Sequence, residues 1–493
     1  MDYACRLNTV EKRFDVAVVG ASITGCIAAM AFARQGRSVL LFDHKYDESP
    51  LTQASHILHP GGIAALDALG LRSALDGVET FPVHGYTVYR HTESANVFFS
   101  LPSKKDGWPE KKTNAVFGVA FRRERLARKL RRMAGSQRSV LVVAATVTQI
   151  VRGGMSGEIM GVECFREQEQ NPVHYLADLT LLCDGPNSTL RSDLSTTSKP
   201  ATAVLRPDPP NRFWAFDIAY GALPVEEMAC SIIDAAGCNI TLFRVSRDTL
   251  RAHIEMTPAL ASTLNTHRDT NLRQYILAHV VPLIPEPAHA SFRRAAASVR
   301  LEPISLGLRC AKAHCHPGVV LLHDQPNTTD ITVDSGMMVA FKDVELLVSL
   351  VGATHCGVLH CRSLANSWRT RLALAKFSLK RKKHTAPLDM VARVLGKWGD
   401  SRDVTHDILR RSIITFLARG SATYHAPMQS LAGLLKRRRR LARPLTRLAC
   451  CAVSESLAAV HGLQLVVAWF RVMGIVWLAC QLAVEALIED ILR

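Results

Sequence analysis

The chain has 493 residues, long enough for two or three domains with cores of their own, and a formal net charge of +17. This charge favours anionic surfaces and partners. The opening segment, MDYACRLNTVEKRFD, lacks the apolar core of a signal peptide, so we expect no secretory leader here. The 13 cysteines include no CxxC pair, which argues against a disulfide scaffold and for reduced, cytosol-facing thiols.

The first predicted elements form a βαβ unit with a glycine turn. An apolar run at 16–19 ends at Gly20, a helical pattern follows, and a second apolar strand ends at an acid. Gly20 permits the tight turn, while the helix N-terminus faces a pyrophosphate and the acid accepts hydrogen bonds from a ribose. An ordinary βαβ core unit is the alternative. The predicted dinucleotide-binding residues are Gly20, Ser22, Ile23, Thr24, Gly25 and Asp43.

Further units of the same kind follow along the chain. The segment LTLLCDGPNSTLR predicts a buried strand that runs into a tight turn at Asp184 and Gly185. Residues 318–347 predict a strand, an acid at Asp324, a polar loop and a helix that begins at Gly336. Strand-like runs between 200 and 300 predict a separate sheet. From about residue 376 the pattern becomes helical, basic and apolar.

Two clusters of cysteine and histidine could supply zinc ligands. The first precedes an apparent buried strand, GVVLL, and the second lies in an apolar helical stretch, so packing is the favoured interpretation and no metal site is predicted. The clusters are Cys310, His314, Cys315 and His316, and His355, Cys356, His360 and Cys361.

The tail joins a basic run, KRRRR at 436–440, to a long apolar stretch at 448–492. Basic residues beside amphipathic or apolar helices suit an anionic membrane face. Charged residues such as Arg471 interrupt the stretch, and they favour helices lying in one leaflet over a spanning helix. A soluble helical cap is the third possibility. Without an accompanying aromatic and basic surface, KRRRR does not predict a nucleic-acid partner.

Several motifs together resemble one family. They are LHPGG (58–62), GLRSALDGVETFPVHGYTVY (70–89), AFRRERLARKLR (120–131), CDGPNSTLR (183–191), SGMMVAFKDVELL (335–347) and APMQSLAGLL (426–435). From about Asp15 to Leu435 the chain resembles the squalene monooxygenases (squalene epoxidases), which are FAD-dependent monooxygenases of the aromatic-hydroxylase fold. The run VAFKD is the most specific of these signals.

The resemblance implies an α/β architecture: a Rossmann-like FAD-binding domain, an inserted β-sheet substrate domain and a C-terminal helical, membrane-associated region. The expected boundaries are 14–80, 119–199 and 301–375 for the three parts of the FAD-binding domain, 81–118 for substrate-domain strands, 200–300 for the substrate domain and 376–493 for the helical region.

The resemblance also assigns site residues. Tyr86 takes the place of the family's active-site tyrosine and would orient the flavin environment through its hydroxyl; a half-buried strand tyrosine is the alternative. Arg125 takes the position that contacts the FAD phosphate, and Asp324 the acid on the ribitol. Asp184 and Gly185 match the family's Ala-Asp-Gly motif and are also predicted to bind the cofactor. Gly336 and Met337 would lie near the isoalloxazine ring.

The implied reaction is epoxidation of squalene to 2,3-oxidosqualene in sterol biosynthesis, with O2 used through a flavin hydroperoxide. The sequence shows no second glycine fingerprint for a nicotinamide cofactor. The resemblance implies that electrons come from a separate NADPH-dependent flavoprotein reductase. The implied location is the cytoplasmic face of the endoplasmic reticulum membrane.

The chain departs from the family pattern where glycines or an acid are expected. The substituted positions are Ser22, His56, His323, Asp334 and Ser335. Side chains in place of glycine restrict close approach to a cofactor. Two alternatives therefore stay open: a non-catalytic relative with weak or no FAD binding, and an FAD monooxygenase that acts on another lipid.

Overall fold

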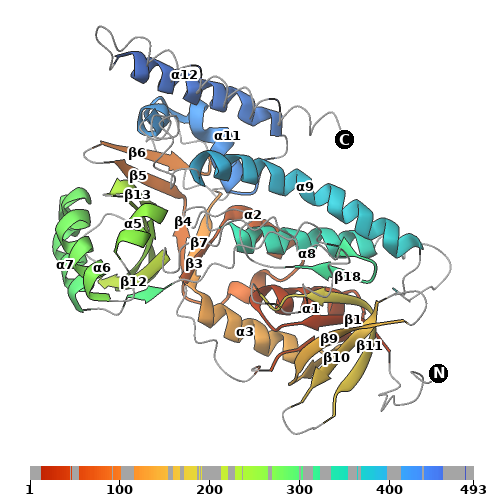
Figure 1. Cartoon of the computed structure of the whole chain (residues 1–493). Helices are drawn as coiled ribbons and strands as arrows, with labels where there is room; N and C mark the ends of the chain where they lie inside the picture. Colours follow the sequence, from red (N-terminus) through yellow and green to blue (C-terminus); the bar gives the residue numbers. More distant parts are fainter. Residues whose placement is uncertain are drawn as a thin grey trace.

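The computed structural model describes residues 13–44, 46, 55–90, 93–100, 116–153, 159–166, 171–185, 188, 190, 213–219, 228–235, 237–264, 269–298, 301–303, 315–322, 335–352, 364, 368–396, 412–435, 438–458, 473 and 484. Three sheets, with helices packed on them, account for most of this part of the chain (Figure 1). The helices of residues 368–458 lie together on one side of the molecule, the upper side in Figure 1.

The first sheet has eight strands and a parallel centre in the order β18-β11-β1-β2-β8. Its central strands are continuous apolar runs because helices cover them and both faces are buried. The register sets Val19 of β1 against Leu182 of β11 and Phe42 of β2, so the residues that follow these three strands meet at one edge. The strands are β1 (Phe14–Val19), β2 (Val39–Phe42), β8 (Val140–Val143), β9 (Thr146–Arg152), β10 (Ile159–Phe165), β11 (Val173–Leu182), β17 (Cys315–His316) and β18 (Val319–Leu321).

Three helices build the main core with this sheet: α1 (Ile23–Arg34), α3 (Arg123–Gly135) and α8 (Gly336–Gly352). Helix α1 is buried over ten of its twelve residues, because α3 and α8 pack against it. Its small residues, four of them alanine, allow this close packing.

The second sheet has seven strands and combines two distant segments of the chain. Strand β5 pairs in parallel with β13, with Tyr86 opposite Ala229, and thereby joins residues 85–98 to the sheet of residues 213–256. The strands are β5 (Gly85–Arg90), β6 (Glu93–Phe98), β12 (Phe213–Ala219), β13 (Ala229–Ala235), β14 (Cys238–Ser246), β15 (Thr249–Met256) and β16 (Glu302–Pro303).

Helices cover one face of this sheet, although the sequence predicted strands through 200–300. Thr257 caps the first of them by accepting a hydrogen bond from Leu260 N–H, and Pro258 occupies its first turn, which favours a helix start. Apolar residues then recur at helical spacing and pack on the sheet. The elements are α5 (Pro258–Thr263), α6 (Asp269–Tyr275), the π-helical η2 (Ile276–Val280), the 3-10 turns η3 (Val281–Leu283) and η4 (Glu286–Ala288), and α7 (His289–Ser298).

A small three-stranded sheet lies between the two large ones (Figure 1). It consists of β3 (Ser55–Leu58), β7 (Gly118–Arg122) and β4 (Thr80–Val83), with α2 (Pro60–Ala68) and the 3-10 turn η1 (Arg72–Leu75) beside it. Of the strands predicted for the substrate domain at 81–118, β5 and β6 join the seven-stranded sheet, while β4 pairs only with β7.

The C-terminal helical region covers the outer end of β5, β6 and β13. It contains α9 (Trp368–Gly396), a helical segment at 412–418, α11 (Ser421–Leu431), the 3-10 turn η8 (Arg438–Leu441) and α12 (Ala442–Ala458). Over the described ranges, no helix is both long enough and apolar enough to cross a bilayer. The predicted α/β architecture with an FAD-type sheet and an inserted β-sheet domain is confirmed; the membrane association of the helical region stays a prediction.

Candidate functional site: a glycine turn and an apolar pocket

The turn after β1 accepts only glycine at two positions. Gly20 has a φ of +96°, and a Cβ there would lie 2.8 Å from the Asp184 Cα. A Cβ on Gly25 would lie 2.0 Å from the Gly20 carbonyl oxygen. Both glycines are therefore fixed by backbone packed against backbone, as a dinucleotide-binding turn requires.

Ser22, which replaces the middle glycine of the fingerprint, is the N-cap of α1. Its φ of −66° is ordinary for a side-chain-bearing residue, and its Oγ accepts a hydrogen bond from Gly25 N–H over 3.1 Å. The substitution thus strains nothing and stabilises the start of the helix. Replacing the glycine by serine therefore causes no backbone strain at this position.

The N-terminus of α1 also retains unsatisfied donors. Within the described ranges, neither the N–H groups of Ile23 and Thr24 nor the buried Thr24 hydroxyl has a hydrogen-bond partner. Helix N-termini with free N–H groups favour anions such as a pyrophosphate. These groups, with the two glycines, fit a dinucleotide.

Asp43, the predicted ribose acid, is fixed by two donors. Its Oδ2 accepts hydrogen bonds from Ala21 N–H at 2.8 Å and from Arg131 Nη2 at 3.3 Å. Arg131 also donates to the Ala21 and Tyr46 carbonyl oxygens. The sequence did not single out Arg131, because it is one of several arginines on α3 and only the packing of α3 on α1 brings it here.

Arg125, the predicted phosphate contact, lies elsewhere on α3. It is half exposed and forms an ion pair with Glu79, whose other carboxylate oxygen accepts a hydrogen bond from Arg247 N–H. In this arrangement Arg125 connects the FAD-type domain to β14 and β15 of the second sheet. Its contact with an FAD phosphate stays a prediction.

The remaining predicted cofactor residues divide into two groups. Asp184 and Gly185 follow β11 at the sheet edge shared with Gly20, and Gly336 and Met337 are buried at the start of α8. Ser335, one of the departures, is buried just before them. Outside the described residues lie Asp324, His323 and Asp334. The same holds for most of the two cysteine and histidine clusters, for which no metal site was predicted: Cys310, His314, His355, Cys356, His360 and Cys361; Cys315 and His316 form β17.

Tyr86 has a buried partner that the sequence did not reveal. Its hydroxyl lies 3.0 Å from His59 Nε2, and the Phe99 ring packs edge-on against both rings. His59 is fully buried and Tyr86 is nearly so. His59 belongs to the HPGG turn that begins α2, and the only signal for it was its place directly before Pro60.

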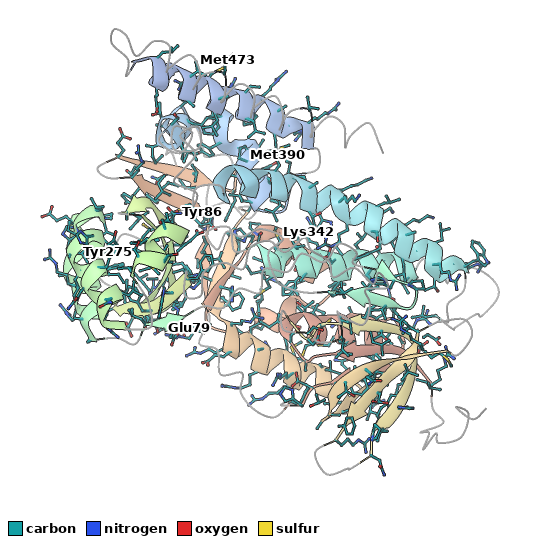
Figure 2. The ribbon with its side chains drawn as sticks, viewed as in Figure 1. Glu79, Tyr86, Tyr275, Lys342, Met390 and Met473 are labelled. Atoms are coloured by element: carbon teal, nitrogen blue, oxygen red, sulfur yellow. The ribbon has the colours of Figure 1, made fainter. Side chains whose placement is uncertain are left out.

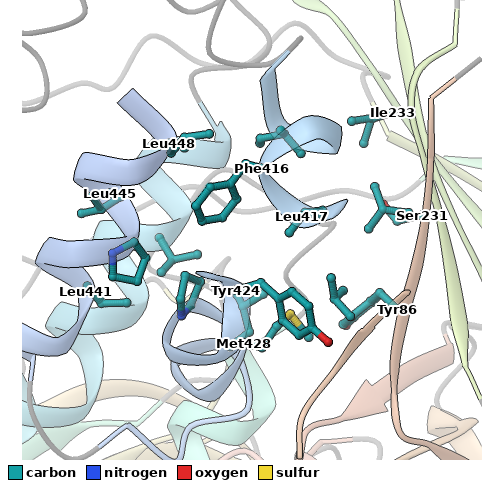
Figure 3. Close-up of a pocket in the computed structure, with 17 residues that line it drawn as sticks. Tyr86, Ser231, Ile233, Phe416, Leu417, Tyr424, Met428, Leu441, Leu445 and Leu448 are labelled. Atoms are coloured by element: carbon teal, nitrogen blue, oxygen red, sulfur yellow. The ribbon is translucent and has the colours of Figure 1, made fainter. Parts of the chain in front are cut away.

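Tyr86 also lines an apolar pocket of about 140 Å³ between the second sheet and the C-terminal helices (Figure 3). Tyr86, Ser231 and Ile233 come from the sheet, and the opposite wall comes from the helices. The helical residues are Val391, Ile413, Phe416, Leu417, Tyr424, Pro427, Met428, Leu431, Leu441, Pro444, Leu445 and Leu448. A pocket of this composition suits a hydrocarbon ligand.

The VAFKD run of α8 attaches the helical wall to the FAD-type domain. Lys342 donates to the Gly433 carbonyl oxygen after α11, and Figure 2 shows it on α8, toward the C-terminal helices. Burial lowers the pKa of Lys342 below its ordinary value, although Glu345 and Asp343 act in the opposite direction. Gly61 N–H of the HPGG turn donates to Ala432 O at 2.7 Å, so three distant segments meet.

Asp343, the next residue, holds α9. Its carboxylate accepts from Arg381 Nε at 2.7 Å and lies 2.8 Å from His384 Nε2, both on α9. Burial alone would raise the pKa of this carboxyl, but Arg381 and His384 outweigh burial and lower it. Asp343 is therefore a buried anion paired with the Arg381 guanidinium, which makes it structural rather than a proton donor.

A parallel sheet with a glycine turn, a strand-end acid and an inserted sheet beside an apolar pocket defines an FAD-binding flavoprotein of the aromatic-hydroxylase type. The FAD-binding domain profile matches residues 13–207. PqsL, described as a probable FAD-dependent monooxygenase from Pseudomonas aeruginosa, superimposes with a TM-score of 0.60 at 18% identity, covering 79% of this chain and 97% of PqsL. That likeness supports the fold.

The squalene epoxidase profile matches residues 176–470. Squalene epoxidase erg1 of Aspergillus fumigatus is 27% identical over 80% of this chain and 77% of its own length. Squalene epoxidase ERG1 of Gibberella zeae is 28% identical over 86% of this chain and 83% of its own length. The chain belongs to the squalene epoxidase family, as the motifs predicted, and it is a divergent member.

Proposed function

We propose that this protein is an FAD-dependent monooxygenase that epoxidises squalene to 2,3-oxidosqualene in sterol biosynthesis. The observation that carries the proposal is the apolar pocket with Tyr86 in its wall. One side of the pocket is the seven-stranded sheet, and the other is a set of helices held by the family-specific run on α8. A hydrocarbon such as squalene requires this kind of lining, since it offers no polar group to recognise.

The residues present fit FAD. Gly20 and Gly25 would allow close backbone approach, the N-terminus of α1 with Thr24 would face the pyrophosphate, and Asp43 would accept a hydrogen bond from the ribose. Gly336 and Met337 would lie along the ring system, with Arg125 and Asp324 as further contacts by family resemblance. When bound, FAD supplies the activation of O2, which no side chain can provide.

The chain's own residues position and shield the reaction. The apolar lining of the pocket disfavours water, which would protect the activated oxygen from wasteful breakdown. The Tyr86 hydroxyl and His59 hold one proton between them in a buried hydrogen bond, so Tyr86 has a fixed orientation. We assign Tyr86 an indirect role: it orders the surroundings of the cofactor rather than attacking the substrate.

Two partners complete the proposal. Electrons come from a separate NADPH-dependent flavoprotein reductase, and the substrate comes from the membrane in which it dissolves. We place the protein on the cytoplasmic face of the endoplasmic reticulum, attached through its C-terminal helices. The basic residues Arg439, Arg440, Arg443 and Arg447 of η8 and α12 support this, because they suit an anionic lipid face.

The proposal is tested by incubating purified, FAD-loaded protein with squalene, NADPH, a flavoprotein reductase and isotopically labelled O2. We expect one labelled oxygen atom in 2,3-oxidosqualene, and no product without the reductase. If the FAD-loaded protein leaves squalene unchanged but oxidises another terpenoid, that terpenoid takes the place of squalene as the substrate. A well-folded protein that takes up no FAD would be a non-catalytic relative of the squalene epoxidases.

A further inference from the structure

The exposed face of α9 carries an apolar stripe that a helix on the surface of a soluble domain does not need. The other face of α9 packs on α8 through buried residues such as Leu374 and Phe377. On the outside, Trp368 is 70% exposed, Leu372 45% and Leu379 64%. Usually the face opposite the core is polar, so this helix has two apolar faces.

The exposed apolar residues form a line. At about 100° per residue, Trp368, Leu372, Ala375 and Leu379 fall within an arc of roughly 60°. Eight large hydrophobic residues of the described chain are strongly exposed, and three of them lie on this line. Their alignment distinguishes them from singly scattered surface residues, which need no explanation.

Basic side chains flank the stripe on both sides. Arg369, Lys376 and Lys383 lie along one edge at helical spacing, and Arg371 and Lys382 lie along the other. No acid occurs in α9 before Asp389. The Arg369 guanidinium also lies over the Trp368 ring, 5.5 Å from its centroid. An aromatic and leucine stripe between rows of lysine and arginine is typical of helices that lie in the plane of an anionic membrane surface.

We propose that α9 is a second membrane-docking element, which lies on an anionic phospholipid bilayer with Trp368, Leu372 and Leu379 inserted at the interface. Membrane contact is then not confined to the tail. An anionic bilayer is the partner that fits this face, because basic side chains accompany the apolar stripe over its length.

The stripe lies on the same helix as part of the pocket wall, so docking through the stripe would bring the pocket close to the membrane. Val391, twelve residues beyond Leu379 on the same helix, lines the apolar pocket. At about 1.5 Å per residue this is roughly 18 Å along α9. A helix held in the leaflet would thus keep the pocket wall close to the lipid phase that supplies an apolar substrate.

The test is sedimentation of the full-length, FAD-loaded protein with phosphatidylcholine vesicles, with and without phosphatidylserine. For Leu372→Ser with Leu379→Ser we expect roughly tenfold weaker binding. The matched control is Leu141→Ser with Phe165→Ser, which removes two comparably exposed apolar side chains from the eight-stranded sheet and is expected to leave binding unchanged. Flavin content confirms that each variant is folded.

Charge and insertion are tested separately. Lys376→Gln, Lys382→Gln and Lys383→Gln together are expected to weaken binding to phosphatidylserine vesicles roughly a hundredfold, with little change on neutral vesicles. Trp368→Phe is expected to abolish the part of the fluorescence blue shift that vesicles induce.

Equal vesicle binding by the stripe variant and its control would overturn the proposal. So would a stripe variant that binds vesicles normally but loses productive coupling to the reductase, because the face would then be a protein interface. Vesicle binding needs no turnover, so a failure of squalene epoxidation would not affect this result.

Discussion

The glycine turn and the helical wall of the pocket are built in opposite ways. The turn lies within residues 14–43. A Cβ on Gly25 would meet the Gly20 carbonyl oxygen five residues earlier, and the backbone of Asp184 packs against Gly20 from the neighbouring strand end. The wall brings together residues from α9, 412–418, α11 and α12 and depends on Lys342 and Asp343 of α8 to hold it. The glycine pattern of the cofactor half can thus be recognised within one short segment, whereas the substrate half is assembled from segments that lie far apart in the chain.

The largest expected effect is at the turn. Gly25→Ala places a Cβ 2.0 Å from the Gly20 carbonyl oxygen, so the strand-helix contact must open. We expect a loss of stability of about 3 kcal/mol or more and no retained FAD, measured by thermal unfolding and visible absorbance.

Gly36→Ala is its control, because Gly36 has a φ of +77° but nothing within 4 Å of its Cβ. This variant should lose only about 1–2 kcal/mol, from backbone strain, and should keep FAD. Equal losses in the two variants would show that packing at Gly25 is not the constraint.

The wall should break when Asp343 loses its charge. Asp343→Asn leaves Arg381 buried without its anion, and we expect a loss of about 3–5 kcal/mol in the free energy of unfolding, measured with urea. Asp67→Asn removes an exposed ion pair with Arg72 and should cost at most about 1 kcal/mol. Similar costs for the two variants would contradict a structural role for the buried pair.

The same carboxylate predicts a pH dependence. The pKa of Asp343 is lowered on folding, so the unfolded chain binds the proton more tightly and the stabilisation is present above the ordinary value of 3.8. The stability difference between the wild type and Asp343→Asn should therefore be constant at neutral pH and shrink as the pH falls below about 4. A difference that grows on acidification would reverse the assigned sign.

Where the two halves meet, Tyr86→Phe should reduce epoxide formation about tenfold, with little effect on the unfolding temperature, since it removes one buried hydrogen bond. His59→Leu should match it, and His59→Gln, which can still bond the hydroxyl, should restore part of the rate. Full activity in Tyr86→Phe would leave this tyrosine a packing residue.

The smallest expected effect is at Ser22, and it tests whether the serine obstructs the cofactor. Ser22→Ala removes the cap of α1 and should cost about 1 kcal/mol, while Ser22→Gly should cost only a few tenths. FAD content should stay unchanged in Ser22→Gly, because the serine does not strain the backbone. A clear gain of FAD in that variant would mean that the side chain does obstruct the cofactor.

The sequence could predict the turn because its evidence is local. Gly20, Gly25 and Asp43 occupy positions that strand and helix geometry fix relative to each other. Arg131 and His59 could not be found in this way, since their partners come from segments 88 and 27 residues away in the chain. The helices at 258–298 were missed for a related reason: prolines there begin helices and turns, and only packing on the sheet distinguishes them from loops.

The resemblance located the VAFKD run, but its physical role required the structure. Lys342 and Asp343 contact Gly433, Arg381 and His384, and no spacing rule connects these residues. The pocket has no sequence signature for the same reason, because its lining is spread from Tyr86 to Leu448.

The proposed function depends most of all on the divergent glycine turn still forming an FAD site. The most direct measurement is the flavin content of the purified protein, from its visible spectrum and the released cofactor. We expect one FAD per chain. A folded protein that stays colourless after incubation with excess FAD would contradict it.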